Sequence, residues 1–443
     1  MITLVIGGVV AVWVVVGGVA LVKLRGGGRL QLEADGWASA ARALQLEQRR
    51  AFFAPGLVLV GNHGDHEVKV TRIASESGTG FSAAIRIGGV HGDVTVSPTC
   101  DPFAVELSGV IQTGDPEFDR TFEIAGPEAL VRATFDDKMR RTALERTPRM
   151  AISKGQIELP LRDAPDGATL EILARALLVL ARRLSIRGDD FDGPICRVAA
   201  TDPCVGVRRR CLAWLVACGA PDEAHVSELK PLLDDEDPEV RLHASQVIGE
   251  QACGTLEALA RDATCADRIR AAAFDGAVDF LPSARRVALI ADLVAAAPPA
   301  ALATEVLRAI ERDQLKRHAP FVRAHLDDAD LHVRIAAAQT ASLVADATWV
   351  PELIARLDDQ ESVVVEVCAA LGRVGTAEAV NALRAAADAS TRRAIREAAR
   401  QAIESIQSRA GEPGRLSVVG EDDAGAVSFA GDDGALSLER SED

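Results

Sequence analysis

The spacing of hydrophobic positions changes along the 443-residue chain, and each stretch predicts a different kind of structure. An uninterrupted apolar run comes first, and short runs of alternating apolar and polar residues follow it. A long stretch with apolar residues every three to four positions comes next, before a tail rich in Gly, Asp and Glu. We therefore expect a mainly α protein. Its predicted parts are a transmembrane anchor (1–24), a small α+β domain (30–186), a linker (187–195), an α-solenoid (196–408) and a disordered acidic tail (409–443).

The first apolar run, residues 2–22, contains no charged side chain over 21 residues. At about 1.5 Å per residue, a helix of this length reaches about 30 Å, the thickness of a bilayer core. No basic residue precedes the run, whereas Lys23, Arg25 and Arg29 follow it, which is the reverse of a cleaved signal peptide. Basic residues collect on the cytoplasmic side of a membrane. The sequence thus predicts a retained single-pass anchor in the inner membrane, with the bulk of the protein in the cytoplasm.

The alternating region predicts a small α+β domain, because its β-branched runs are separated by Gly, Asn, Asp and Ser. Thr169 is the expected N-cap of its last and most apolar helix, and Lys154-Gly155 is the expected turn of a hairpin. The predicted helices are 35–53, 127–146 and 169–185, the predicted strands are 57–61, 67–73, 81–87, 93–97, 105–112 and 120–126, and the predicted hairpin is 149–161.

Two polar stretches of this domain contain residue types that bind metals or divide acid and base roles. Both stretches also contain the Gly, Asn, Asp or Pro residues that tight turns require. No metal-ligand spacing is matched, so we interpret both stretches as turns and expect neither a metal site nor a catalytic residue. The residues concerned are His63, Asp65, His66, His91 and Asp93 for a metal, and Asp115 and Asp119 for catalysis.

Composition narrows the possible functions further. The net charge of −16 argues against a nucleic-acid-binding protein, which carries a basic surface, and Arg208-Arg209-Arg210 is the one tight basic cluster found. The absence of Tyr leaves few aromatic platforms for bases or sugars. The eight cysteines show neither CxxC nor His-paired spacing, so structural zinc is not expected and a reducing compartment fits. We expect no cofactor and identify no small-molecule substrate.

The acidic stretch LLDDEDPEVRLHA, residues 232–244, recurs along the second half of the chain. The recurrences align on an apolar residue followed by Arg, with steps of 33, 29, 64, 31 and 31 residues. A degenerate copy near 298–310 divides the step of 64, which makes seven units. A period near 31 with two helices per unit is typical of an α-solenoid. The aligned pairs are Val207-Arg208, Val240-Arg241, Ile269-Arg270, Val333-Arg334, Val364-Val365 and Ile395-Arg396.

These recurring residues have a structural interpretation. The Asp-rich segments 234–237, 327–330 and 358–361 are expected to turn the chain and to cap the next helix, because carboxylates suit the free N–H groups of a helix N-terminus. The arginine that follows is expected to bond the acidic turn of the adjacent repeat, so that the stack carries a ladder of ion pairs. The predicted ladder residues are Arg208, Arg241, Arg270, Arg334 and Arg396.

The pattern L-x-D-x-D-P-x-V-R-x-x-A, clearest in residues 233–244 and 326–337, resembles HEAT repeats of the phycobilisome-lyase type. The resemblance covers about residues 196–408 and implies either a protein-binding scaffold or a lyase-type enzyme acting on a prosthetic group. We favour the scaffold, with another protein bound on the concave face of the solenoid. A third hypothesis is a sensor or chaperone-like binder centred on the α+β domain. The candidate protein-binding residues, all on predicted second helices, are His243, Gln246, Gln339 and Arg373.

The acidic tail contains three copies of an apolar-Ser-apolar tripeptide after Gly, within 414–418, 425–429 and 434–438. Such copies are either short linear motifs that add a strand to a partner or the result of simple sequence expansion.

Overall fold

The computed structural model describes residues 36–50, 56–74, 81–99, 107–161, 165–186, 191–219 and 221–410, together with 417–418 and 427–428. The predicted anchor and most of the predicted tail lie outside the described residues. Within the described part of the chain, no helix is both long enough and apolar enough to cross a membrane. The chain divides into two compact units, one up to Ile248 and one from Gly249.

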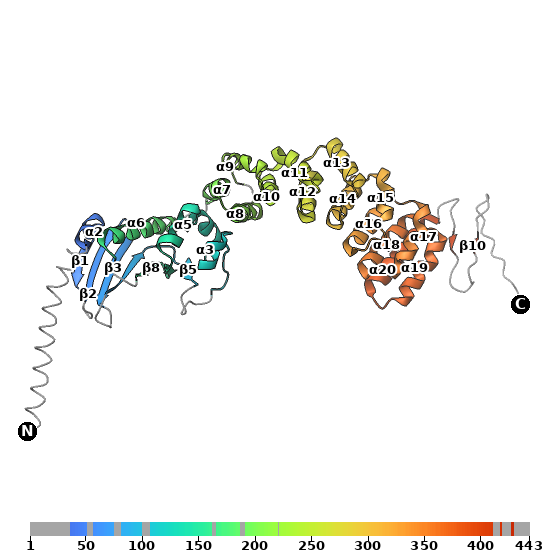
Figure 1. Ribbon diagram of the computed structural model, residues 1–443. Coiled ribbons are helices and arrows are strands. Elements are labelled where there is room, and N and C mark those ends of the chain that lie inside the picture. The colour runs from blue at the N-terminus through green and yellow to red at the C-terminus, as the bar shows by residue number, and fades with distance from the viewer. Residues whose placement is uncertain are drawn as a thin grey trace, which may run out of the picture. The chain divides into compact units, whose positions relative to one another are not determined.

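The first unit contains an eight-stranded antiparallel sheet in the order β1-β2-β3-β4-β8-β7-β5-β6 (Figure 1). Its register aligns apolar residues across neighbouring strands, since Leu59 pairs with Val70, Val70 with Ile85, and Ile85 with Leu159. All four side chains are at most 2% exposed. The strands are β1 (Glu47–Arg50), β2 (Gly56–His63), β3 (His66–Ala74), β4 (Phe81–Gly88), β5 (Thr95–Pro98), β6 (Phe122–Ala125), β7 (Ala151–Ser153) and β8 (Gln156–Leu161).

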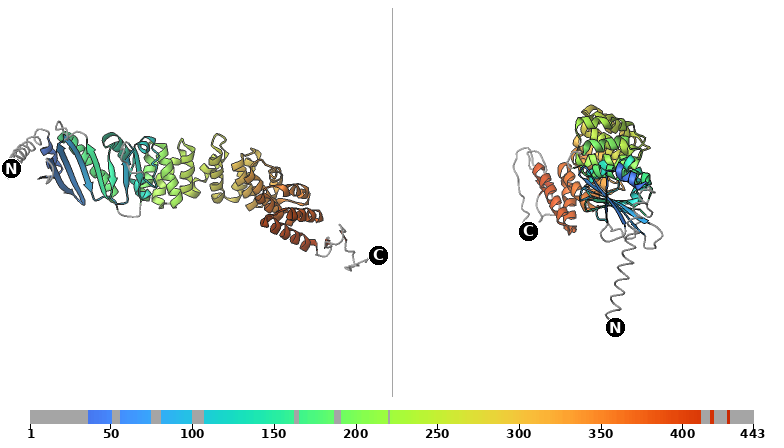
Figure 2. Two further views of the ribbon diagram at one scale, coloured as in Figure 1. Left: turned by 90° about the horizontal axis from the view of Figure 1, so that it is seen from below. Right: turned by 90° about the vertical axis from the view of Figure 1, so that its left-hand side faces the viewer.

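One face of the sheet is covered by helix α6 (Gly167–Leu184), which packs on β4 and on the short helix α2 (Trp37–Ala43). Figure 1 shows both helices above the strands, and the view from below shows the strands in front of them (Figure 2). The buried residues of α6, among them Leu170, Leu173 and Leu177, recur at helical spacing. The core of this domain therefore lies between α6 and the sheet.

The helix predicted over 35–53 is wrong in its second half. Helix α2 ends at Ala43, Gln45 adopts a positive φ of 50°, and the chain continues as β1. Leu44 and Leu46 are both buried although they are two positions apart, which suits extended chain rather than a helix. Pairing with β2 overrides the helical spacing of the flanking residues.

Two further strand predictions need correction. The described residues of the predicted strand 105–112 form no strand. The predicted strand 120–126 begins only at Phe122, because residues up to Thr121 form helix α3 (Pro116–Thr121). Asp115 caps this helix and Pro116 occupies its first turn, a combination that starts a helix.

The single helix predicted over 127–146 is two helices, α4 (Glu128–Thr134) and α5 (Asp137–Arg146). Asp136 separates them, since its carboxylate accepts a hydrogen bond from the backbone N–H of Met139 at 2.9 Å and so begins a new helix. In the same way Asp166, and not Thr169, is the N-cap of α6, with its carboxylate 2.7 Å from the Thr169 nitrogen.

The predicted hairpin over 149–161 is confirmed as β7 and β8. Lys154 and Gly155 have φ angles of 49° and 74°, the left-handed pair that a tight two-residue hairpin turn requires. The strands predicted at 57–61, 67–73 and 81–87 are confirmed as β2, β3 and β4, and the one at 93–97 begins two residues later as β5.

Seven helix pairs follow the sheet domain, as the repeat spacing predicts. The linker predicted over 187–195 is too long, because α7 begins at Asp192. The pairs are α7 (Asp192–Thr201) with α8 (Val205–Cys218), α9 (Glu223–Leu229) with α10 (Pro238–Ile248), α11 (Cys253–Arg261) with α12 (Asp267–Phe280), α13 (Ser283–Ala295) with α14 (Ala300–Arg312), α15 (Ala319–Ala324) with α16 (Leu331–Val344), α17 (Val350–Ala355) with α18 (Glu361–Val374), and α19 (Ala377–Ala389) with α20 (Arg393–Ala410).

In the second unit the second helices α12, α14, α16, α18 and α20 pack successively on one another (Figure 1). Small residues allow this close approach. Ala337 and Ala341 of α16 are fully buried, and Gly372 of α18 lies against Ala402 of α20. The buried Thr340 hydroxyl donates to the Leu307 carbonyl of α14 at 3.1 Å. The degenerate copy predicted near 298–310 is the regular helix α14 of this stack.

Two short strands of the tail are described. β9 (Ser417–Val418) pairs antiparallel with β10 (Val427–Ser428). They belong to the first two copies of the tail tripeptide, and the third copy (434–438) lies outside the described residues.

Candidate functional site

Two of the three predicted acidic turns, 234–237 and 327–330, end in a carboxylate that caps the second helix, whereas in the third, 358–361, the N-cap is Gln360 and its side chain makes no capping hydrogen bond. Asp237 Oδ1 accepts from the backbone N–H groups of Glu239 at 3.1 Å and Val240 at 3.0 Å. Asp330 Oδ1 accepts from Val333 at 3.3 Å in the same way. Because the first N–H groups of a helix have no partner within it, these aspartates stabilise the helix starts.

The recurring arginine is the fourth residue of its helix, and its Nη1 returns to the turn before it. Arg241 Nη1 donates to the carbonyls of Asp235 at 2.7 Å and Glu236 at 3.2 Å, which lie six and five positions earlier. The same two bonds are made by Arg208, Arg334 and Arg396.

Two of these arginines also form an ion pair with an aspartate of the next acidic turn. We call each such ion pair between neighbouring units a rung of the ladder. Nε and Nη2 of Arg334 each lie 2.9 Å from a carboxylate oxygen of Asp359. Nε of Arg208 lies 3.0 Å from Asp235. The hydrogen bond from Arg334 holds the pKa of Asp359 below its usual value.

The other three predicted ladder residues behave differently. Within the described residues, the bonds of Arg241 and Arg396 go to their own turns only. Arg270 is nearly buried, and its Nε donates to the Ala260 carbonyl at 3.2 Å instead of to a carboxylate. In this part of the solenoid Arg286, the fourth residue of α13, forms an ion pair with Asp313 at 2.6 Å.

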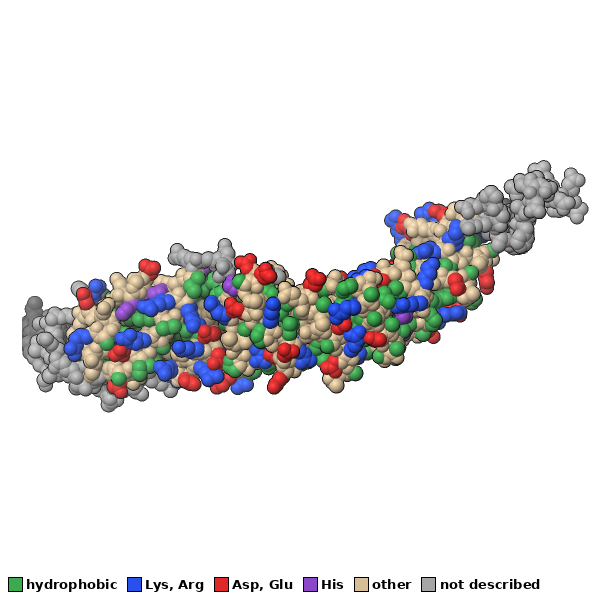
Figure 3. Space-filling view, turned by 90° about the horizontal axis from the view of Figure 1, so that it is seen from above, with side chains coloured by type: hydrophobic (Ala, Val, Ile, Leu, Met, Phe, Trp, Pro, Cys, Tyr) green, Lys and Arg blue, Asp and Glu red, His purple; other side chains and the backbone are tan. Residues whose placement is uncertain are grey.

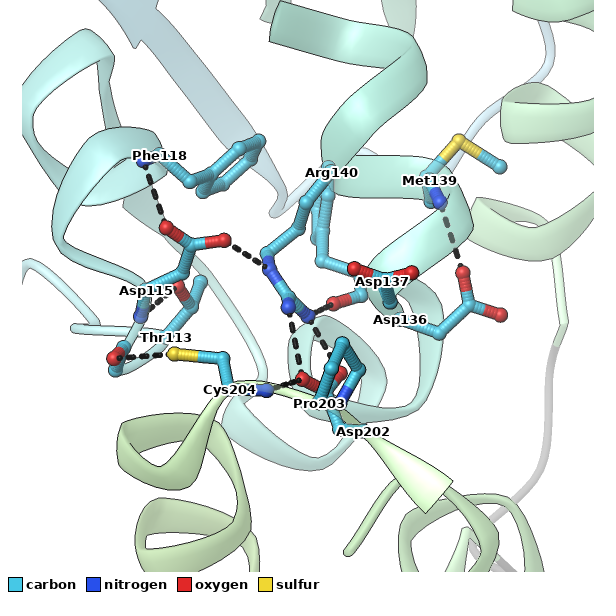
Figure 4. Close-up of polar contacts among 12 residues, drawn as sticks. Thr113, Asp115, Phe118, Asp136, Asp137, Met139, Arg140, Asp202, Pro203 and Cys204 are labelled. Carbon is cyan, nitrogen blue, oxygen red and sulfur yellow. Dashed lines mark hydrogen bonds and ion pairs between the residues drawn. The ribbon is translucent and has the colours of Figure 1, made fainter.

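A further rung, missed from the sequence, joins the sheet domain to the first helix pair (Figure 4). Nη1 and Nη2 of Arg140 lie 2.9 and 3.0 Å from the two carboxylate oxygens of Asp202. Arg140 is the fourth residue of α5, and its Nη1 donates to the carbonyl of Phe135, five positions earlier, at 2.8 Å. Asp202 lies six positions before Arg208, and Asp235 likewise lies six positions before Arg241. Arg140 therefore occupies the place that the arginine of a preceding repeat would take.

The Arg140–Asp202 ion pair is the most buried of the three rungs. The side chains of Arg140 and Asp202 are 1% and 0% exposed, and Nε of Arg140 also contacts Asp115 at 2.9 Å. Burial alone would lower the pKa of Arg140, but the hydrogen bonds to both carboxylates raise it. Burial would likewise raise the pKa of Asp115, yet Arg140 and the N–H of Phe118 together lower it. The guanidinium of Arg140 therefore lies between two carboxylates that both accept its hydrogen bonds.

Two glycines allow the backbones to touch beside this cluster. A Cβ atom on Gly206 would lie 2.0 Å from the Gly114 carbonyl oxygen, and one on Gly114 would lie 2.3 Å from that of Gly206. Gly114 also has a φ of 98°, which disfavours other residues. The thiol of Cys204 lies 3.5 Å from the Gly114 carbonyl oxygen. Helix α8 thus begins directly against the loop that carries Asp115.

The structure does not arrange Asp115 and Asp119 as an acid–base pair. Asp119 Oδ1 accepts from the backbone N–H and hydroxyl of Thr113 at 2.9 and 2.7 Å, and its Oδ2 accepts from the Gly114 N–H at 2.9 Å. Asp115 caps α3 and binds Arg140. Both carboxylates shape the loop at the junction, consistent with the interpretation of this stretch as a turn.

Two of the three histidines of the sheet domain lie against backbone carbonyl groups. His63 Nε2 lies 2.6 Å from the Leu44 oxygen, and His66 Nδ1 lies 3.1 Å from that of Gly88. His91 and Asp93 are 3.9 Å apart, and Asp65 is exposed on the turn between β2 and β3. Over the residues that the structure describes, no three His, Cys, Asp or Glu side chains are grouped to hold a metal ion.

The four candidate protein-binding residues lie on second helices, in two different units. His243 and Gln246 are half-buried on α10 of the first unit. In the second unit Gln339 is half-buried on α16, and Arg373 is exposed on α18. Nε2 of Gln339 donates to Glu366 of α18 at 3.3 Å.

Sequence reasoning named Gln339 but missed its acidic neighbours in the acidic strip, which we define as Glu305, Glu311, Gln339 and Glu366 on α14, α16 and α18. Glu311 is half-buried, and burial together with the negative charge of Glu366 raises its pKa, while Arg308 acts in the opposite direction. Arg308 forms its ion pair with Glu305, at 2.8 Å. The negative charge of Glu366 on α18 therefore disfavours the ionised form of Glu311 on α14, although α16 lies between these two helices in the stack.

The stacked helix pairs define the protein class as an α-solenoid. Residues 319–404 match the HEAT repeats, so the chain contains HEAT repeats in its C-terminal part. No curated protein sequence matches the chain.

Several solved structures resemble the chain at low sequence identity. Kap121p bound to Ste12p is 14% identical over 54% of this chain and 31% of its own, with a TM-score of 0.33. The karyopherin Kap121p bound to the extreme C-terminus of the protein phosphatase Cdc14p is 13% identical over 63% and 33%, with a TM-score of 0.34. An engineered protein is 18% identical over 49% and 90%, with a TM-score of 0.22. The chain spans about a third of the length of the karyopherin, and no functional argument follows from these scores.

Proposed function

We propose that this protein is a membrane-tethered, non-catalytic scaffold whose HEAT repeats bind a basic segment of another protein. The half-buried carboxylates of Glu311 and Glu366 in the acidic strip carry the proposal. Burial and the negative charge of Glu366 disfavour the ionised form of Glu311, and a lysine or arginine from a partner would offset both effects. The net charge of −16 would assist the approach of such a partner at low ionic strength.

The tether is proposed from the sequence alone. Residues 2–22 are long and apolar enough to span a bilayer, and the basic residues after them favour a cytoplasmic position for the rest of the chain. Labelling of an exposed cysteine such as Cys218 on intact cells by a membrane-impermeant reagent would contradict that orientation. The phycobilisome-lyase subclass is likewise a proposal, and it rests on the repeated L-x-D-x-D-P-x-V-R-x-x-A pattern.

The binding proposal is tested by neutralising the strip. The double variant Glu311→Gln and Glu366→Gln keeps the side-chain shapes and should reduce partner capture by chemical crosslinking in native membranes by about tenfold or more. Glu378→Gln removes one charge from the exposed surface of the first helix α19 and serves as the control.

Capture should also weaken as salt is added, because the attraction is electrostatic. Undiminished capture by the double variant would remove the acidic strip from consideration. If deletion of residues 411–443 then abolished capture, the acidic tail would be the binding element.

A further inference from the structure

The outer side of α6, away from the sheet, exposes a stripe of large aliphatic side chains. Ile172, Val179 and Ile186 are 48%, 46% and 51% exposed, and they are three of the six exposed large hydrophobic residues found among the described residues. Their seven-residue spacing keeps them within about 40° of one another around the helix and about 10 Å apart along it. Ile186 continues the stripe on the turn that follows α6.

Basic side chains border this aliphatic stripe. Arg175 and Arg182 are exposed along one side of it, and the nearby acidic residues are paired, Glu171 with Arg175 at 2.9 Å and Asp136 with Arg183 at 2.7 Å. In the part of the chain that the structure describes, Arg182 forms no ion pair. The space-filling view looks onto the helix-covered side of the sheet domain and shows hydrophobic side chains next to Lys and Arg side chains there (Figure 3). An aliphatic, net-positive face stands out in a chain of charge −16.

The chain enters the sheet domain at the beginning of the same helix. Trp37 Nε1 donates to the Pro165 carbonyl at 2.6 Å, just before α6 begins. A Cβ atom on Gly167 would lie 2.1 Å from the Gly36 oxygen, so the two backbones touch. Residues 23–35, which join the apolar run to this point, span at most about 45 Å, and α6 itself is about 27 Å long. If residues 2–22 cross a membrane, α6 is within reach of the surface on which they emerge.

We propose that the outer face of α6 lies on the anionic surface of the membrane that holds the tether. The aliphatic stripe would enter the boundary between headgroups and acyl chains, and Arg175 and Arg182 would meet lipid phosphates. This combination of an aliphatic face and flanking arginines is what interfacial helices use to bind anionic lipids. The inference rests on the proposed tether and adds a second, charge-dependent contact to it.

The test separates the two contacts in one experiment. The full chain, with a protease recognition sequence inserted in the Gly26–Gly28 run, is reconstituted into vesicles of phosphatidylcholine with or without phosphatidylglycerol. After cleavage, flotation measures how much of the C-terminal fragment stays on the vesicles. We expect retention on the phosphatidylglycerol vesicles to exceed that on phosphatidylcholine by about thirtyfold at low salt, the change expected for two arginines at an anionic surface.

One single and one double substitution then locate the contact. Val179→Glu should release the cleaved fragment from phosphatidylglycerol vesicles, and Arg175→Glu with Arg182→Glu should do the same. Val216→Glu replaces an exposed valine of α8 in the same unit, 40% exposed, and should leave retention unchanged. Because all these side chains are exposed, circular dichroism of each variant should match that of the parent protein.

The outcomes distinguish the inference from the function on which it rests. Failure of the uncleaved chain to float with any vesicle would contradict the proposed tether. Normal flotation followed by equal release from both kinds of vesicle would leave the tether and overturn the α6 contact. If the stripe instead joins two copies of the chain, Val179→Glu would dissociate a dimer in sedimentation measurements without any dependence on lipid charge, which also overturns the proposal.

Discussion

The Arg140–Asp202 rung of the first unit and the Arg334–Asp359 rung of the second both join a guanidinium to the two oxygens of an aspartate, through Nη1 and Nη2 in the first and Nε and Nη2 in the second, but they differ in burial. The first pair is 1% and 0% exposed, and the second is 14% and 12% exposed. Removing one partner of a fully buried pair leaves a charge that water cannot solvate, whereas a partly exposed charge regains water. Removing the arginine of the same sequence motif should therefore lower the free energy of unfolding by different amounts at different places in one chain.

The largest effect is expected at the buried rung. Arg140→Ala should lower the free energy of unfolding of the first unit by about 3–5 kcal/mol, because Asp202 and Asp115 would lose their cation. Native-state hydrogen exchange read by mass spectrometry would show the loss in α5, α7 and α8. Arg141→Ala, next in sequence but 63% exposed, is the control and should change stability by less than about 0.5 kcal/mol. Equal effects of the two substitutions would show that burial does not determine how much the ion pair contributes to the free energy of unfolding.

A smaller effect is expected where the backbones touch beside that rung. Gly206→Ala places a methyl group against the Gly114 carbonyl oxygen and should cost about 1–3 kcal/mol through overpacking. The same exchange measurement would detect it as lost protection at the start of α8. Gly254→Ala in α11 meets open space, so it should be neutral or stabilising by up to about 1 kcal/mol. A neutral Gly206→Ala would mean that the loop carrying Gly114 yields without cost.

The smallest effect is expected at the partly exposed rung of Arg334 and Asp359. Arg334→Ala should cost about 1 kcal/mol, and the loss of protection should stay within α15 to α18 because repeats contact only their neighbours. The rung also predicts a pH dependence. Arg334 lowers the folded-state pKa of Asp359, so the stabilisation is present above the unfolded value of about 3.9 and is lost as pH falls through the folded value. Acid titration of the variant should show a smaller loss than that of the parent, and identical curves would contradict the rung.

The solenoid was predictable because its signals are local. Each cap acts on an N–H group three residues ahead, and each arginine returns to carbonyls five and six residues behind, so one repeat contains most of its own contacts. The hairpin at Lys154-Gly155 was predictable for the same reason. The seven helix pairs follow from the period of about 31 residues without any knowledge of how they pack.

The junction was not predictable in the same way, because Arg140 and Asp202 are 62 residues apart. A signal was present, since Asp136, Arg140 and Ala143 have the spacing of Asp237, Arg241 and Ala244. It was hidden because residues 127–146 have continuous helical spacing, and the turn at Phe135 contains neither Gly nor Pro. The acidic strip was missed for a related reason, since its members come from three different helices.

The match between rungs also bears on how such a chain can change its length during evolution. The first helix pair accepts the guanidinium of Arg140 with Asp202, six positions before its own Arg208, and offers Arg208 to Asp235 of the next pair. Duplication or loss of one whole unit of about 31 residues preserves every such pairing, whereas a change by half a unit would leave a donor or an acceptor without its counterpart. The sheet domain supplies Arg140 at the start, so it can precede an array of any whole number of repeats without leaving the first aspartate unmatched.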